Sequence, residues 1–283
     1  MRLEMQSEMR QQMRRQVQVL HQEMRRQKMC AQMCTEVRSK VRSEMCPQMR
    51  AKELMGVGCN RRSPPARGAT AQVAGLRLLE TYAGLARRGE HLLGQILGGD
   101  LPRQWRHYPE DDAIDQGTGF QWFYHSHSPE DRPGAFEHGH IHLFARRKLW
   151  SRRMRSAREI EFASLADDPT GQVNTRHLMT IGLDAKGIPI SLFTVNSWVT
   201  GDLMLSASTT ALLLEQLTLD TGNDDVDAVI EYVVRLYQNE IRDLLVRRDA
   251  LLYQKRSPGL LSDESVEVLS ELAINVDRKI AGE

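Results

Sequence analysis

Five histidines fall within eighteen residues of a chain that has nine histidines among its 283 residues. They are His125, His127, His138, His140 and His142. Imidazole is the commonest protein ligand for transition metals, and it titrates nearer to neutral pH than other side chains. A cluster of this density indicates a site, and metal binding is the chemistry that its residue type favours.

The spacing of these histidines predicts two neighbouring strands. Side chains alternate between the faces of a strand, so His125 and His127 share one face of a first strand. By the same rule, His138, His140 and His142 share one face of a second strand. Residues two apart are separated by roughly 6.5–7 Å, so three in a row span roughly 13 Å, too far for one ion. Because facing Cβ atoms are about 4.5–5.5 Å apart, we expect one ion to take two histidines of the second strand and one or both of the first.

A metal ion in this cluster would have mainly nitrogen donors. Nitrogen ligands at about 2.0–2.1 Å suit zinc, iron(II) or copper. Nearby acids that could add a carboxylate are Glu137, Glu130, Asp112 and Asp115. Three histidines, or two histidines and a carboxylate, would leave a coordination position open for chemistry. The alternative interpretation is a solvated, histidine-rich sheet face.

The second histidine strand also has the pattern of a known enzyme family. His138-Gly-His-Ile-His-Leu-Phe144 resembles the His-x-His-x-His-x-x run of the histidine-triad nucleotide hydrolases and transferases. In that family the middle histidine attacks a phosphate, so the resemblance implies this role for His140. Gly139 stands where that family has an apolar residue, and the family's upstream Asn-Gly and Gln pattern is absent from this chain.

Three motifs between Trp105 and Asp202 form a more specific pattern. They read His125-Ser-His127, Glu137-His-Gly-His-Ile-His-Leu-Phe144 and Leu192-Phe-Thr-Val-Asn-Ser-Trp-Val-Thr-Gly-Asp202. Together they resemble a bacterial domain family of unknown function. Because that family has no assigned activity, the resemblance implies an identity and no mechanism.

The last of these motifs adds a second candidate site, with Asn196, Trp198, Thr200 and Asp202. We expect a strand end there, at which an amide, an indole donor and an acid could hold a small-molecule ligand. The alternative is a packed corner in which Trp198 is buried and Asn196 bonds to the backbone.

The elements that must position these residues follow from periodicity and turn residues. The pattern predicts a helix over 71–98, a loop over 100–118, a first hairpin from 121–128 and 136–146, a second hairpin from 177–184 and 187–196, and helices over 206–217, 225–254 and 263–280. Helices that flank a small antiparallel sheet, built from two hairpins, indicate an α+β fold.

Composition divides the chain into three parts. Residues 1–57 are rich in Met, Gln, Arg and Glu and contain no aromatic residue, which predicts a helical or disordered extension. Residues 58–70 have the Gly, Pro and Arg content of a linker. Residues 71–283 then form a single α+β domain, with the histidine-rich hairpin at 121–146 and the C-terminal helices at 206–280.

Charge, hydropathy and cysteine usage limit the partners and the compartment. The formal net charge is +1, and no apolar run reaches the length of a membrane span, so we expect neither a nucleic-acid nor a membrane partner. All four cysteines lie before residue 60 and leave none for a disulfide in the domain. We therefore expect a reducing, cytoplasmic setting.

Three functions are compatible with these observations. The first is a metal-binding domain, in the form of a small-molecule metalloenzyme of the hydrolase or oxygenase kind. The second is a ligand- or partner-binding module without enzymatic activity. The third is a nucleotide hydrolase of the histidine-triad type.

Overall fold

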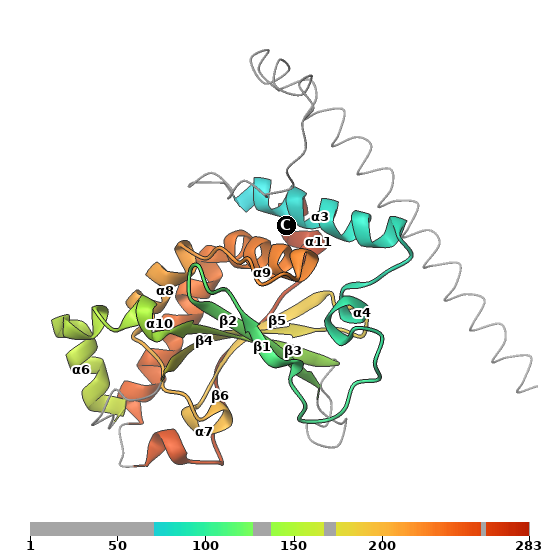
Figure 1. Ribbon diagram of the computed structural model, residues 1–283. Coiled ribbons are helices and arrows are strands. Elements are labelled where there is room, and N and C mark those ends of the chain that lie inside the picture. The colour runs from blue at the N-terminus through green and yellow to red at the C-terminus, as the bar shows by residue number, and fades with distance from the viewer. Residues whose placement is uncertain (1–70, 127–136, 167–173, 256–258, 283) are drawn as a thin grey trace, which may run out of the picture. The chain divides into compact units, whose positions relative to one another are not determined.

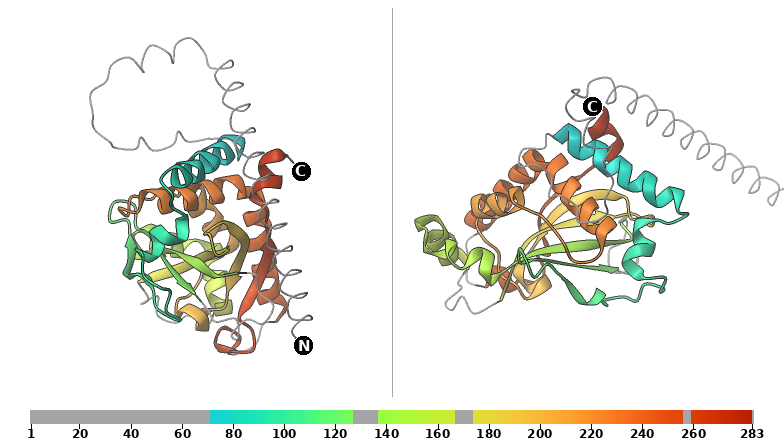
Figure 2. Two further views of the ribbon diagram at one scale, coloured as in Figure 1. Left: turned by 90° about the vertical axis from the view of Figure 1, so that its right-hand side faces the viewer. Right: turned by 45° about the horizontal axis from the view of Figure 1, so that its top comes forward.

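The computed structural model of the protein describes residues 71–126, 137–166, 174–255 and 259–282 (Figure 1). These residues belong to one compact unit, Pro64–Glu283. The extension predicted at 1–57 and the linker predicted at 58–70 lie outside the described residues. Figure 2 shows the described part from two further sides.

A single six-stranded antiparallel sheet forms the centre of the unit. Its strands are β1 (Tyr108–Ile114), β2 (Phe120–Ser126), β3 (Gly139–Arg146), β4 (Thr175–Leu183), β5 (Pro189–Val195) and β6 (Val268–Ala273). They lie in the sheet in chain order, each antiparallel to the next. Both predicted hairpins are confirmed as β2–β3 and β4–β5, and so is the α+β fold class.

The two edge strands lie where the sequence pattern predicts other structure. The loop predicted over 100–118 contains β1, which begins Tyr-Pro and carries three acids, a composition that an edge strand accommodates. The helix predicted over 263–280 is wrong for most of its length, because β6 occupies 268–273. A short apolar run fits a helix and a strand equally well, and pairing with β5 decides the outcome here.

Helices account for most of the remaining described residues. They are α3 (Ala71–Arg87), α4 (Leu92–Leu97), α5 (Arg147–Trp150), α6 (Ala157–Ala166), α7 (Ser197–Thr200), α8 (Ala207–Glu215), α9 (Asp224–Leu236), α10 (Gln238–Gln254) and α11 (Val276–Ala281). The helix predicted over 71–98 is two helices, separated near Gly89, which has a positive φ of 71°. The helix predicted over 225–254 is also two, because α9 packs against α3 whereas α10 packs against α8 and β6.

The hydrophobic core lies between one face of the sheet and the helices. Trp122, Tyr124, Ile141 and Leu143 point into it and are fully buried. The views agree that α3 and α9 lie on this side of the sheet (Figures 1 and 2). The Trp122 indole Nε1 donates a hydrogen bond to Asp227 Oδ1 of α9 at 2.9 Å, which links helix and sheet.

The other sheet face, called the histidine face below, carries the residues that alternate with these. Cross-strand pairing aligns His125 with His140, and Phe123 with His142. On the next strand, Thr180 pairs with His142. The fold therefore turns the alternation of β2 and β3 into one apolar face toward the helices and one histidine-bearing face.

Candidate metal centre

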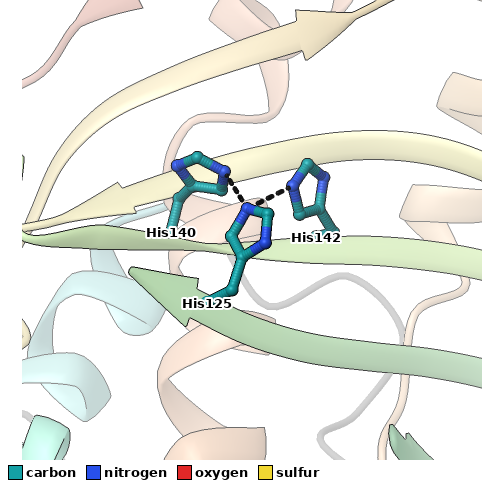
Figure 3. Close-up of side chains that lie close together, drawn as sticks. All are labelled: His125, His140 and His142. Atoms are coloured by element: carbon teal, nitrogen blue, oxygen red, sulfur yellow. Dashed lines mark hydrogen bonds between the residues drawn. The ribbon is translucent and has the colours of Figure 1, made fainter. Parts of the chain in front are cut away.

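Three of the five clustered histidines converge on the histidine face (Figure 3). His125 Nε2 lies 2.7 Å from His140 Nε2 and 3.2 Å from His142 Nε2. One ligand nitrogen from each ring lies within 4.8 Å of the others, so the group could hold a metal ion. Tetrahedral zinc with nitrogens at 2.0–2.1 Å separates them by about 3.4 Å. The two observed separations, 2.7 and 3.2 Å, are shorter than this value, so the rings would move slightly apart around an ion.

Strand geometry explains why these three meet. His125 and His140 are directly opposite each other on paired strands, and His142 is two residues further along β3. Two histidines of the second strand and one of the first come together, as the strand spacing predicts. All three side chains are withdrawn from solvent, with exposed fractions of 7% for His125, 2% for His140 and 0% for His142.

Glu137 lies behind the cluster and orients one of its rings. Its Oε1 is 2.7 Å from His140 Nδ1. A carboxylate only accepts hydrogen bonds, so His140 donates through Nδ1 and directs its unprotonated Nε2 toward the other two rings. The same support of a ligand histidine by a carboxylate is common at metal sites. Glu137, considered from the sequence as a direct ligand, contacts His140 at Nδ1, the nitrogen that does not face His125.

A glycine makes room for this carboxylate. Gly182 pairs with His140 across β3 and β4. A Cβ atom at Gly182 would lie 2.3 Å from Glu137 Oε2 and 2.1 Å from Ser191 Oγ. The Ser191 hydroxyl donates to Glu137 Oε2 at 3.2 Å. Any larger residue at position 182 would displace the group that orients His140.

His177 and Thr180 support the third ring. His142 Nδ1 lies 3.1 Å from His177 Nε2, and Thr180 Oγ1 is 3.2 Å from both nitrogens. Burial lowers the pKa of His177 to about 3, and the positive charge of Arg248 lowers it further. His177 is therefore neutral near pH 7, and its Nε2 can accept the Nδ1 proton of His142. That tautomer leaves His142 Nε2 unprotonated, facing His125.

The other two clustered histidines are not part of this group. His138 Nδ1 lies 2.7 Å from the Tyr124 hydroxyl, and the Tyr124 ring belongs to the apolar core. Strand β3 begins at Gly139, so the strand alternation that aligns His140 and His142 does not extend to His138. Burial lowers the pKa of His138. His127 lies outside the described residues.

The remaining acids considered from the sequence have other partners. Asp112 Oδ1 lies 2.9 Å from His107 Nδ1. Asp115 closes the turn between β1 and β2, where its carboxylate accepts from the Gly117 and Thr118 backbone amides. Glu130 lies outside the described residues.

The second candidate site is a corner of the fold whose polar groups bond within the chain. Asn196 is fully buried, and its Nδ2 donates to the carbonyls of Leu260 and Val266 at 2.9 and 3.0 Å. Trp198 Nε1 donates to the same Val266 carbonyl at 3.0 Å. Asp202 accepts from Thr175 Oγ1 at 2.5 Å, and burial raises the pKa of Asp202. The Asn196 amide, the Trp198 indole and the Asp202 carboxylate thus each have a hydrogen-bond partner within the chain.

Sequence reasoning missed His107, His177 and Thr180. His177 and Thr180 lie on β4, and His107 immediately precedes β1, so none belongs to a spacing pattern with the clustered histidines. The signal that selects them is three-dimensional: pairing of β3 with β4, and stacking of the His107 ring on Phe123 at a centroid distance of 3.7 Å.

Comparisons with known proteins give a family and no function. Residues 72–274 match the family model described as Domain of unknown function (DUF6969). This match bears out the resemblance to a domain family of unknown function. No curated protein and no solved structure gives a significant match. Within the described part of the chain, no helix combines the length and the apolar character needed to cross a membrane.

Proposed function

The chain belongs to the family described as Domain of unknown function (DUF6969), and this description names no activity. From the site we propose that the protein binds one divalent transition metal ion through His125, His140 and His142 and uses its open coordination position for chemistry on a small molecule. The observation that carries the proposal is the convergence of three Nε2 atoms.

Protonation states favour an ion at this point. The Glu137 carboxylate keeps the His140 proton on Nδ1, and a neutral His177 can keep the His142 proton on Nδ1. Two unprotonated nitrogens then face His125, whose Nε2 has one proton at most. A cation at this point would accept one lone pair from each of the three rings.

Three nitrogen donors suit zinc, and iron(II) and copper also bind such a set. Zinc held by three histidines keeps a water molecule at its fourth position and lowers the pKa of that water to about 7. We therefore favour hydrolysis or hydration over oxygenation as the reaction class. The chain contributes by fixing three rings and by excluding bulk solvent from them.

One alternative, the histidine-triad type of nucleotide hydrolysis, has less support. It requires His140 to attack a phosphate. His140 is 2% exposed, with Nδ1 bonded to Glu137 and Nε2 facing His125 at 2.7 Å. Neither nitrogen is presented to a nucleotide in this arrangement.

Elemental analysis of protein prepared without a histidine tag tests the proposal. We expect one equivalent of metal per chain, and loss of that metal in His125→Ala, His140→Ala and His142→Ala. His91→Asn is the matched control, because His91 caps α4 through its Nδ1 and asparagine also caps helices. Circular dichroism of each variant separates loss of the site from loss of the fold.

Thermal unfolding gives a second measure of the same site. At a free metal concentration of about 100 times Kd, binding adds about 2.7 kcal/mol to the free energy of unfolding, which raises Tm by about 5–10 °C for a unit of this size. Absence of stoichiometric Zn, Fe, Cu, Ni or Mn, together with an unchanged Tm after metal addition, would contradict the proposal. A non-enzymatic binding module would then be the better interpretation.

A further inference from the structure

A histidine–aspartate pair lies beside the three-histidine cluster. His107 Nδ1 is 2.9 Å from Asp112 Oδ1. The other oxygen, Asp112 Oδ2, accepts a hydrogen bond from Gln121 Nε2 at 2.7 Å, and Gln121 Oε1 accepts from Arg146 at 3.1 Å. The carboxylate is thus held from both sides. Because an ionised carboxylate only accepts hydrogen bonds, His107 Nδ1 must carry a proton and donate to it. The unprotonated Nε2 of His107 is left as a base.

The pair is connected to the cluster through aromatic rings. The His107 ring stacks on Phe123 with centroids 3.7 Å apart and planes 8° from parallel. Phe123 in turn contacts His142, with ring centroids 5.1 Å apart. The His107 and His125 ring centroids are 6.3 Å apart. His107 therefore lies next to the cluster, while Phe123 separates it from the rings of β3.

Solvent exposure distinguishes His107 from the three converging histidines. Its side chain is 41% exposed, whereas His125, the most exposed member of the cluster, is 7% exposed. Trp105, which is 61% exposed, approaches the His125 ring edge-on at 6.2 Å. His107 thus extends from the neighbourhood of a buried site to bulk water.

The backbone around the pair is in an unusual conformation. Trp105 and Asp112 are the two non-glycine residues of the described chain with positive φ, at 63° and 54°. Between Tyr108 and Ala113, β1 advances five residues while its partner β2 advances two, from Tyr124 to Trp122. This bulge brings Asp112 back to His107. Bulges and positive φ values of this kind concentrate at functional sites.

We propose that His107, oriented by Asp112, is the proton-transfer group of the site, carrying protons between the open coordination position and bulk water. The inference rests on the proposed function, because it needs the metal centre to supply an acidic water molecule. In the metal-loaded site, an O–H bond of that water would break and the proton would form an N–H bond at His107 Nε2. The Asp112 carboxylate, 2.9 Å from Nδ1, stabilises the resulting imidazolium, and the His107 side chain, which is 41% exposed, gives the proton to bulk water.

Nitrogen NMR of protein labelled with ¹⁵N-histidine tests the geometry without any activity. The proposal expects a neutral His107 to carry its proton on Nδ1, with Nε2 unprotonated, and expects Asp112→Asn to abolish this preference. A His107 proton on Nε2 in the wild-type protein would overturn the proposal, since Nε2 could not then accept a proton.

Hydrolysis of 4-nitrophenyl acetate by the zinc-loaded protein tests the role. We expect His107→Ala to lower the rate about 100-fold, in the range of general base effects, with metal content unchanged. Free imidazole itself cleaves this ester, so rescue is the part of the imidazole-dependent rate of zinc-loaded His107→Ala that exceeds the rate of the zinc-free variant at the same imidazole concentration. A purely structural role of His107 predicts no such excess. His107→Phe keeps a ring on Phe123 and should lose the rate without losing the fold, and His91→Asn should keep both.

The outcomes separate the two proposals. Absence of any stoichiometric transition metal from the wild-type protein, with no uptake of added zinc, means that the proposed function is wrong. Full zinc content with an unaltered rate in His107→Ala and His107→Phe overturns the proton-transfer role alone. A zinc-loaded wild-type protein that is no faster than the zinc-free protein also overturns it, because no proton then needs to be carried.

Discussion

Each ring of the cluster uses one nitrogen toward the shared centre, and two of the three rings have a known partner on the other nitrogen. Glu137 holds the far side of His140, and His177 with Thr180 holds the far side of His142. Outer contacts of this kind fix the tautomer and the ring orientation of metal ligands. If the proposed function holds, these contacts orient the rings before an ion binds, which lowers the cost of binding one.

Replacement of the orienting carboxylate should weaken metal binding without removing a ligand. In Glu137→Gln the amide can present its NH₂ group to His140 Nδ1, which no longer enforces the required tautomer. We expect zinc affinity to fall about 10–100-fold, as for other outer contacts of metal ligands. Competition with a chromophoric chelator measures it.

Glu271→Gln provides the control for that measurement, because Glu271 is exposed on β6 and the same charge is removed there. An affinity in Glu137→Gln within twofold of this control would show that the carboxylate does not orient His140.

At the scale of single residues, the sequence predicts that histidines of two neighbouring strands come together, but it does not predict which residues do so. Alternation on two strands predicts that two histidines of the second strand approach one or both of the first, and in the structure His140 and His142 of β3 lie close to His125 of β2. It does not show that β3 begins at Gly139 and so excludes His138. It also does not show His107 or His177, since these depend on a bulge in β1 and on the pairing of β3 with β4.

At the scale of elements, the interior of the sheet follows from local pattern and its edges do not. The β4–β5 turn has a local signal: Asp184 Oδ1 accepts from the Lys186 and Ile188 amides, and Gly187 has a positive φ of 79°. Strands β1 and β6 have no comparable signal. A bulge interrupts the pairing of β1 with β2, and β6 pairs with β5, which is distant in sequence. The acids of β1 and the helix-like spacing of β6 therefore predict the wrong structure.

The link between α9 and the sheet offers a test at this scale. Asp227 accepts from Trp122 Nε1 at 2.9 Å, and from the Thr221 amide and hydroxyl at 2.8 Å each. Asp227→Ala leaves these donors without their acceptor in a buried place. We expect the free energy of unfolding to fall by about 3 kcal/mol, measured by urea denaturation followed by circular dichroism.

Asp225→Ala is the neighbouring comparison for this variant. Asp225 pairs with Arg88 near the surface at 2.5 Å, and solvent screening leaves such exposed pairs with little effect on stability. Equal losses of stability in the two variants would contradict a specific role for the Trp122–Asp227 bond.

At the scale of the whole molecule, the site belongs to the part of the chain that the family shares. The family model spans residues 72–274, and the compact unit spans Pro64–Glu283. Every residue of the three-histidine cluster and of its supporting contacts lies within both ranges. The chemistry proposed here is therefore a property of this unit.

A shortened chain tests that statement. We expect residues 64–283 to unfold cooperatively at the Tm of the full chain and to contain the same amount of metal. Scanning calorimetry and elemental analysis measure the two quantities. A loss of metal in a shortened chain that still folds would show that residues before 64 contribute to the site.

The two strands that supply the three rings are joined by a connection whose ends the cluster brings together. His125 and His140 are 15 residues apart in sequence and directly opposite in the sheet. An ion bound by both would act as a cross-link, removing open forms of this loop from the unfolded ensemble much as a disulfide does. Because the entropy of closing a loop grows only with the logarithm of its length, doubling this connection costs about 0.6 kcal/mol. The length of the segment between the two histidines therefore has little effect on the free energy of bringing the three rings together.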